Sequence, residues 1–188
     1  GNQNIIRSRD DTYYNLQASG ANTKSLQADV TVLGDLTINS ILNAANNTIS
    51  LSGDWTNNGS FTEGTGTVIF EGTADQGISI AADPLFSNLT IDKNSGTLVL
   101  SDDAQVSSTL SMLNGNINAN GNTLTLGVST ASIGTLSHFS GTILGKFERW
   151  VNTTGVSYNF PIGSASNIHE MLINFNNLTN GSIVTEFV

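Results

Sequence analysis

Residues 88–91 read Asn-Leu-Thr-Ile, residues 97–100 read Thr-Leu-Val-Leu, and residues 123–126 read Thr-Leu-Thr-Leu. An earlier part of the chain has similar stretches in the same order, with Asn-Leu at 15–16 and Thr-Ile-Ser-Leu at 48–51. The offset between the two parts is nearly the same from Asn15 to Asn88 as from Thr48 to Thr123. A long internal repeat of short strands predicts a stacked β architecture, in which each unit contacts mainly its neighbours.

Glycine- and asparagine-rich turns separate the predicted strands over residues 30–126. Within each strand apolar and polar residues alternate, as in a half-buried strand, and Gly and Asn tolerate the positive φ of tight corners. Such strands could pair through hairpins in a sandwich or barrel, or stack in parallel one coil apart in a solenoid. The long repeat favours the solenoid, with coils of about 20 residues.

We therefore expect an all-β fold, a parallel β-solenoid. The units 13–52 and 86–127 should superimpose, with Leu89 on Leu16 and Leu124 on Ile49. The alternation also places one set of apolar side chains in the interior. This predicted core consists of Ile38, Leu51, Val68, Phe70, Leu89, Ile91, Leu98, Leu100, Leu110, Met112, Leu124 and Leu126.

The predicted organisation has three parts. Residues 1–29 are polar and weakly patterned and form a lead-in or partial coil, and residues 30–136 form the solenoid repeats. From residue 137 the aromatic content rises and the Gly/Asn corners become rarer, which predicts longer, antiparallel strands. An open solenoid end must be covered, so we expect residues 137–188 to form a β cap or the beginning of a β-sandwich.

Composition excludes several classes of partner. Six Lys and Arg against fifteen Asp and Glu give a formal net charge of −9, which argues against nucleic acid and against anionic membrane surfaces. No cysteine is present, so disulfides and thiolate sites are excluded. No apolar run has the length of a membrane span. The chain starts Gly-Asn-Gln and ends on a strand-like stretch, so we interpret it as a segment of a longer protein whose neighbouring repeats are partners.

Several stretches resemble one family. They are Gly53–Phe61, Gly64–Thr73 and Phe86–Ile91, followed by Gly115-Asn116-Ile117, Asn122–Gly127, Ser137–Gly141 and Phe160–Gly163. In this order they resemble the repeats of very large secreted proteins of Bacteroidota, over roughly residues 13–188. The resemblance implies a surface adhesin, as in gliding motility, exported by type IX secretion. It also implies contacts with glycans, surfaces and the secretion machinery. The family's C-terminal sorting domain is not in this sequence, so the repeat region alone implies the secretion route.

Asp102 and Asp103 are the only adjacent carboxylates outside Asp10-Asp11. Neighbouring residues of a strand point to opposite faces, so the two could share a site only in a turn. A solvated corner is the favoured interpretation, with Ca²⁺ binding as the weaker one. A glycosidase needs two carboxyl groups across the sugar bond. We expect no catalytic residue and no cofactor other than Ca²⁺.

Other candidate side chains are isolated. The two histidines, His138 and His169, lie far apart in the sequence and belong to no cluster with metal-ligand spacing. Trp55 and Trp150 are the candidate ligand contacts, because exposed indoles stack on sugars, although core positions are commoner for tryptophan. A threonine face that binds ice needs Thr-x-Thr on every coil. That pattern fails at Thr48-Ile49-Ser50 and Thr97-Leu98-Val99, so we expect ordinary strand threonines.

The sequence thus predicts a structural and adhesive extracellular segment, a stalk whose polar faces make many weak contacts. Two alternatives remain open. One is a polysaccharide-degrading enzyme on a β-helix, and the other is a trimeric phage or secretion-apparatus fibre.

Overall fold

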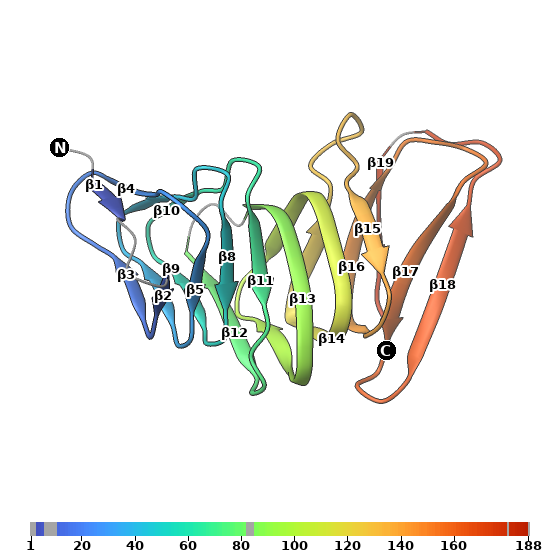
Figure 1. The fold of residues 1–188 in the computed structure, drawn as a ribbon. Helices are drawn as coiled ribbons and strands as arrows, with labels where there is room; N and C mark the ends of the chain where they lie inside the picture. Colours follow the sequence, from blue (N-terminus) through green and yellow to red (C-terminus); the bar gives the residue numbers. More distant parts are fainter. Residues whose placement is uncertain (1–2, 6–10, 82–84, 180, 188) are drawn as a thin grey trace.

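The structure is a computed structural model that describes residues 3–5, 11–81, 85–179 and 181–187. The chain winds as a parallel β-solenoid of about 7 turns, with antiparallel strands at the C-terminus. Figure 1 shows the coils following one another from the N-terminal end to the C-terminal end. The predicted all-β solenoid is therefore confirmed.

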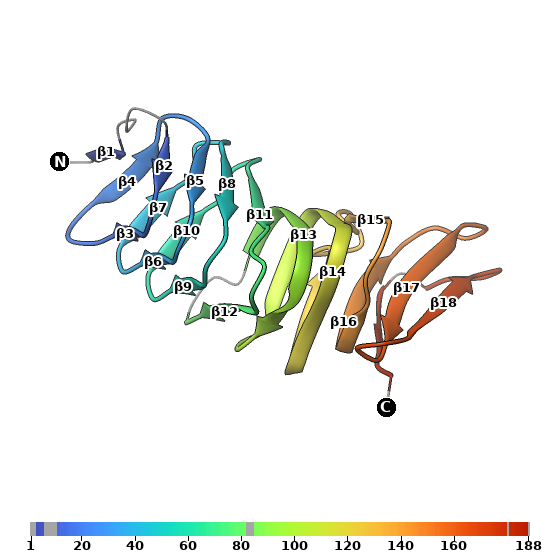
Figure 2. The same cartoon turned by 60° about the horizontal axis from the view of Figure 1, so that its bottom comes forward.

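Each coil contributes strands to three stacks, which Figure 2 separates. The first stack contains β2 (Thr12–Tyr13), β5 (Val30–Val32), β8 (Thr48–Leu51), β11 (Thr67–Phe70), part of β13 (Leu85–Leu100), part of β14 (Ala104–Leu126) and β15 (Thr135–His138). The second contains β3 (Leu16–Ala18), β6 (Leu36–Ile38), β9 (Trp55–Asn57), β12 (Gln76–Ile80), later parts of β13 and β14, and the start of β16 (Ile143–Val151).

The third stack begins with β1 (Gln3–Ile5), β4 (Thr23–Leu26), β7 (Ile41–Asn43) and β10 (Ser60–Thr62). The later coils continue it with Leu85–Phe86 on Gln105–Val106, and with residues 123–126 on residues 146–149. Parallel pairing therefore starts before residue 30 and extends past residue 136.

The core lies between the stacks, on the inward side of each strand. Burial alternates along the strands, as in β5, β8 and β11. All twelve predicted core residues are buried, and the most exposed of them, Val68, is 3% exposed. The alternation rule thus identified the interior correctly.

The predicted superposition of the two long units is wrong. Leu89 stacks between Val68 and Leu110 in the first stack, in the column that contains Ile49. Leu16 belongs to the second stack, and Leu124 pairs with Phe147 in the third. One coil leads from Thr48 to Thr67, and the next, slightly longer, leads from Thr67 to Asn88. The offset between the two units does not equal a whole number of such coils. It therefore matches strands of one stack with strands of a different stack.

Asparagine and aspartate side chains connect successive coils at the corners. The Asp29 carboxylate accepts a hydrogen bond from the Thr48 amide one coil later, at 2.7 Å, and Asp54 does the same for Gly77. The same contact is made by Asn15 with Asp35, Asp35 with Asp54, Asn46 with Thr65, Asp75 with Thr97, Asp103 with Thr123 and Asn116 with Thr142. These bonds satisfy corner amides that the strand ladders leave unpaired.

Antiparallel strands cover the C-terminal end of the core. β17 (Ser157–Gly163) pairs with β18 (Ile168–Asn174), and β19 (Gly181–Thr185) pairs with β16. Phe160 is buried and makes an edge contact with Phe147 of β16, with ring centroids 5.8 Å apart. These strands therefore cover apolar side chains that would otherwise be exposed at the end of the last parallel coil.

Candidate functional sites

Asp102 and Asp103 point to different coils. The Asp102 carboxylate accepts hydrogen bonds from the Ile80 amide at 2.8 Å and the Ser79 hydroxyl at 3.3 Å, in the preceding coil. Asp103 accepts from the Thr123 amide in the following coil. Each carboxylate is thus engaged by a different neighbour. Within the described ranges, no three acidic or histidine side chains gather as a metal-binding group.

Trp55 is a core residue, and its prediction as a ligand contact is wrong. Its side chain is 1% exposed and makes edge contacts with the rings of Phe61 and Phe86, at 4.9 and 5.3 Å. A stacked sugar needs an exposed ring face, which this packing does not leave. Trp150 on β16 is half-buried and stands opposite Ser182 of β19, so its role stays a prediction.

A small hollow of about 120 Å³ lies beside Trp55 on the outside of the second stack. It is lined by Asp54, Trp55, Thr56, Gly77, Ser79 and Ser101. Gly77 occupies an outward position between Asp54 and Val99, and a Cβ there would meet only Asp54, at 3.6 Å. The missing side chain of Gly77 thus opens the hollow, and the hydroxyls and carboxylate around it suit a hydroxyl-rich ligand.

Two columns of hydroxyl side chains cover the first stack; we name them the hydroxyl face. The first column is Thr48, Thr67, Asn88, Thr109 and Thr135, and the second is Thr12, Thr31, Ser50, Ile69, Thr90, Ser111 and Ser137. Only Asn88 and Ile69 lack a hydroxyl. The sequence did not reveal this face, because which residues form one column depends on the register between coils. Thr97-Leu98-Val99, for example, belongs to the second stack.

The buried Lys93 and Gln76 were also missed from the sequence. Both side chains are 1% exposed. The Lys93 ammonium donates to the carbonyls of Gly72 and Ala74, each at 2.8 Å, and to Gln76 Oε1 at 2.7 Å. Desolvation lowers the pKa of Lys93, and Asp75 and Asp54 oppose this. A lone charged residue in a β pattern normally faces solvent, so no sequence signal marked this site.

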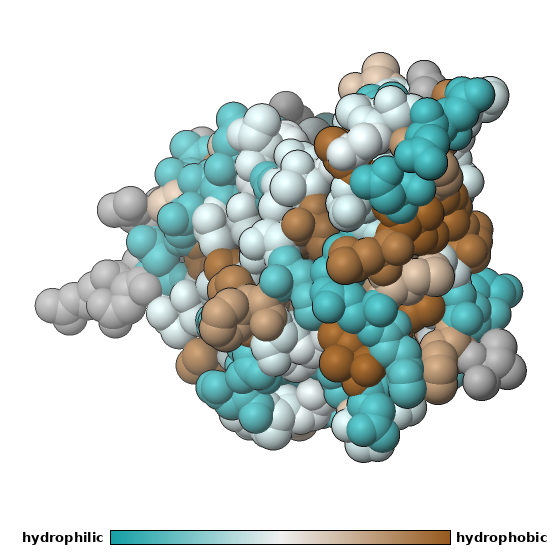
Figure 3. All heavy atoms as spheres, turned by 90° about the vertical axis from the view of Figure 1, so that its right-hand side faces the viewer, coloured by the Kyte–Doolittle hydropathy of each residue, from teal (hydrophilic) through white to brown (hydrophobic). Residues whose placement is uncertain are grey.

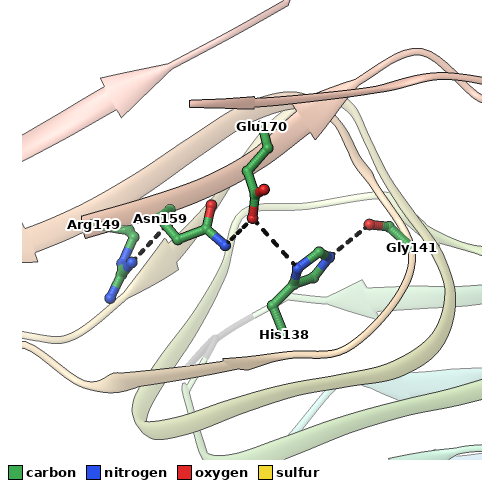
Figure 4. Close-up of polar contacts among 5 residues, drawn as sticks. All are labelled: His138, Gly141, Arg149, Asn159 and Glu170. Carbon is green, nitrogen blue, oxygen red and sulfur yellow. Dashed lines mark hydrogen bonds and ion pairs between the residues drawn. The ribbon is translucent and has the colours of Figure 1, made fainter. Parts of the chain in front are cut away.

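Figure 4 shows a polar cluster between β15, β16, β17 and β18. His138 Nε2 lies 2.8 Å from the Gly141 carbonyl and therefore donates to it, while Nδ1 lies 4.0 Å from Glu170. The Asn159 amide also donates to Glu170. His138 thus contacts the Glu170 carboxylate and the Gly141 carbonyl, and the cluster links β18 to the last coil. The other histidine, His169, stacks on Phe187 with ring centroids 4.2 Å apart.

Arg149 is the buried cation of the same region. It is 7% exposed, donates to the Asn159 carbonyl at 2.6 Å, and lies 5.6 Å and 5.7 Å from the ring centroids of Tyr158 and Phe160. Desolvation by burial lowers its pKa to about 10. Its contacts join β16 to β17, which indicates a role in holding the C-terminal strands in place.

Apolar side chains also gather on the C-terminal end of the molecule, which Figure 3 shows face on. Leu172 on β18 is 64% exposed and Val184 on β19 is 54% exposed. Both stand on the outward side of strands whose other side packs against the core through Ile173 and Ile183. Among the described residues, none covers these two side chains.

Comparison of the chain with family models, with curated proteins and with solved structures gives no match. The resemblance to Bacteroidota surface proteins therefore stays a prediction. In the part of the chain that the structure describes, no helix is long and apolar enough to cross a membrane.

Proposed function

We propose that this chain is a structural and adhesive segment of a large bacterial cell-surface protein. It acts as a stalk and as a multivalent contact surface outside the cell. The observation that carries this proposal is the unbroken series of parallel pairings from β2 to β16. A solenoid held coil to coil gives length and stiffness for few residues.

The outward faces support the adhesive part of the proposal. They carry polar side chains at repeating positions, and weak contacts that repeat along a rigid axis add by multivalency. The hollow at Gly77 offers hydroxyls and a carboxylate to a glycan. Type IX secretion and gliding motility belong to the same proposal and rest on the resemblance alone. So does the location on the cell surface.

The proposal is tested by glycan binding. The folded protein should bind one or more surface polysaccharides weakly and without shortening them. Gly77→Val should reduce binding at least about tenfold, because a side chain at this position fills the hollow. Thr37→Val, on the same stack two coils away, should bind like the unmodified protein.

The enzyme alternative makes the opposite prediction. Chain shortening that is abolished by Asp102→Asn or Asp103→Asn would replace the adhesive proposal with a lyase or hydrolase. A mass measurement in solution addresses the fibre alternative, since a stable trimer would favour it over a monomeric stalk.

A further inference from the structure

Strand β18 forms one edge of the long sheet. In the described part of the chain it pairs with β17 alone, and it lies at the far C-terminal end in both ribbon views (Figures 1 and 2). An edge strand presents a row of backbone amides and carbonyls that can pair with a further strand. The outer side of β18 therefore offers hydrogen bonds to a partner.

The two ends of this sheet differ in how well they are protected against such pairing. At the other end stands β2, which has only 2 residues. β18 has 7 residues, contains neither lysine nor proline, and pairs with β17 in unshifted register, without a bulge. Short length, lysine, proline and bulges are the usual features that keep an edge strand from pairing. β18 lacks all four, which favours pairing at this edge.

The side chains of β18 also favour a partner strand. Leu172 is 64% exposed and Ile168 is 46% exposed. The one carboxylate of the strand, Glu170, contacts Asn159 and His138 of its own molecule. A partner strand would complete the backbone ladder and at the same time remove exposed apolar surface from water.

The sequence of β18 is complementary to itself in one antiparallel register. A two-fold axis at Leu172 places this residue opposite its own copy, and it places Met171 opposite Ile173 on the side that packs partly against the core. The same register sets the Glu170 carboxylate opposite the Asn174 amide, which can donate a hydrogen bond to it. An axis at Glu170 would instead oppose two carboxylates, and an axis at Met171 would set Glu170 against Leu172. Only the axis at Leu172 therefore matches apolar with apolar and polar with polar.

We propose that β18 joins two copies of this chain end to end, as an antiparallel two-fold pair centred on Leu172. The long sheet then continues from one solenoid into the other, with the two N-terminal ends at opposite extremities (Figure 1). One strand pair buries less than the roughly 1,600 Å² of a standard interface, so this dimer is a weak one. The formal net charge of −9 on each copy opposes association, and salt screens that repulsion. The inference concerns the C-terminal end and does not depend on the adhesive role.

A single cysteine at the axis tests this register, because the chain has no cysteine of its own. Directly opposite residues of an antiparallel pair have Cβ atoms about 4.5–5.5 Å apart, close to the span of a disulfide. Leu172→Cys, oxidised by molecular oxygen with a copper catalyst, should therefore form disulfide-linked dimers. Two controls should give at least about tenfold less linked product, because their cysteines do not meet in this register. They are Ile168→Cys, on the same strand but away from the axis, and Val184→Cys, exposed on β19.

Sedimentation equilibrium measures the association of the unmodified 188-residue chain without a crosslink. It should show a monomer–dimer equilibrium in the micromolar range that strengthens as the salt concentration rises. Leu172→Lys should weaken the dimer at least about tenfold, because two ammonium groups then meet at the axis. Leu172 is an exposed side chain, so circular dichroism of this variant should match that of the unmodified protein.

Three results would overturn the proposal. The chain could stay monomeric at every protein and salt concentration, or it could form a trimer, which would favour the fibre alternative. The third is crosslinking of Ile168→Cys or Val184→Cys as efficient as that of Leu172→Cys, which would indicate random collisions or a different contact surface. The crosslink is a gain of signal at one position, so a loss of folding cannot imitate it.

Discussion

Leu124→Asp should lower the free energy of unfolding by about 4 kcal/mol or more and unfold at least its own coil. Leu124 is fully buried and stacks on Phe147, which in turn contacts Phe160 of the C-terminal strands. Aspartate removes the apolar contact and places a carboxylate without a partner in the core. Urea unfolding followed by circular dichroism measures the change.

Two variants control for this result. Leu124→Met conserves volume and should cost less than about 1.5 kcal/mol. Ser111→Asp introduces the same charge on the same strand β14, on its outward side, and should change stability by no more than about 0.5 kcal/mol. Unaltered stability of Leu124→Asp would refute the inward orientation of Leu124. Because coils unfold in part independently, hydrogen exchange should show the earliest loss of protection around β14 and β16.

The fold class and the core could be predicted from the sequence because both depend on local alternation. Within the predicted strand region, alternating stretches such as Leu36–Ile38, Thr48–Leu51 and Thr67–Phe70 are strands in the structure. The register between coils could not be predicted, because all three stacks repeat the same alternation and the same corners. A match such as that of residues 15–16 with residues 88–89 therefore joins strands of different stacks as readily as strands of one stack.

The same ambiguity concealed the candidate sites. Whether Thr48 and Thr67 belong to one column depends on register, and register depends on coil lengths, which differ between successive coils of the first stack. For Trp55 the core was the commoner expectation, and the sequence left a ligand contact open because tryptophan occurs both in cores and on sugar-binding surfaces. The role of Lys93 depends on carbonyls of the preceding coil, which no local pattern identifies.

Gln76→Leu should destabilise the protein by about 3 kcal/mol or more, because Gln76 joins three successive coils. Its Oε1 accepts from the Gly72 amide at 2.9 Å and from Lys93, and its Nε2 donates to the carbonyls of Leu51 and Gly53 at 3.1 and 2.6 Å. All the hydrogen-bonding capacity of the amide is thus used. Leucine has a similar volume but leaves these buried groups without partners. Urea unfolding measures the loss, and Gln17→Leu at an exposed position of β3 is the matched control.

Lys93→Met should lower the free energy of unfolding by about 1–2 kcal/mol at pH 7, less than Gln76→Leu does. The change leaves the Gly72 and Ala74 carbonyls unpaired, but it also removes the desolvation penalty of a buried charge. The double variant should fall short of the sum of the two losses by about 1 kcal/mol, since both changes break the same bond. An additive double variant would show that the Lys93–Gln76 contact contributes nothing of its own.

The pH dependence of Lys93 provides an independent test of its burial. Desolvation lowers the pKa of Lys93 below its usual 10.5, against the attraction of Asp75 and Asp54. Between that lowered value and 10.5 the unfolded chain binds the proton more tightly than the folded chain does. The free energy of unfolding therefore increases as the pH rises through this window. Lys93→Met lacks this gain. The stability difference between the unmodified protein and Lys93→Met should therefore widen as pH rises towards 10.5. A difference that narrows instead would mean that the three acceptors around the ammonium outweigh its desolvation and hold the proton more firmly in the fold than in water.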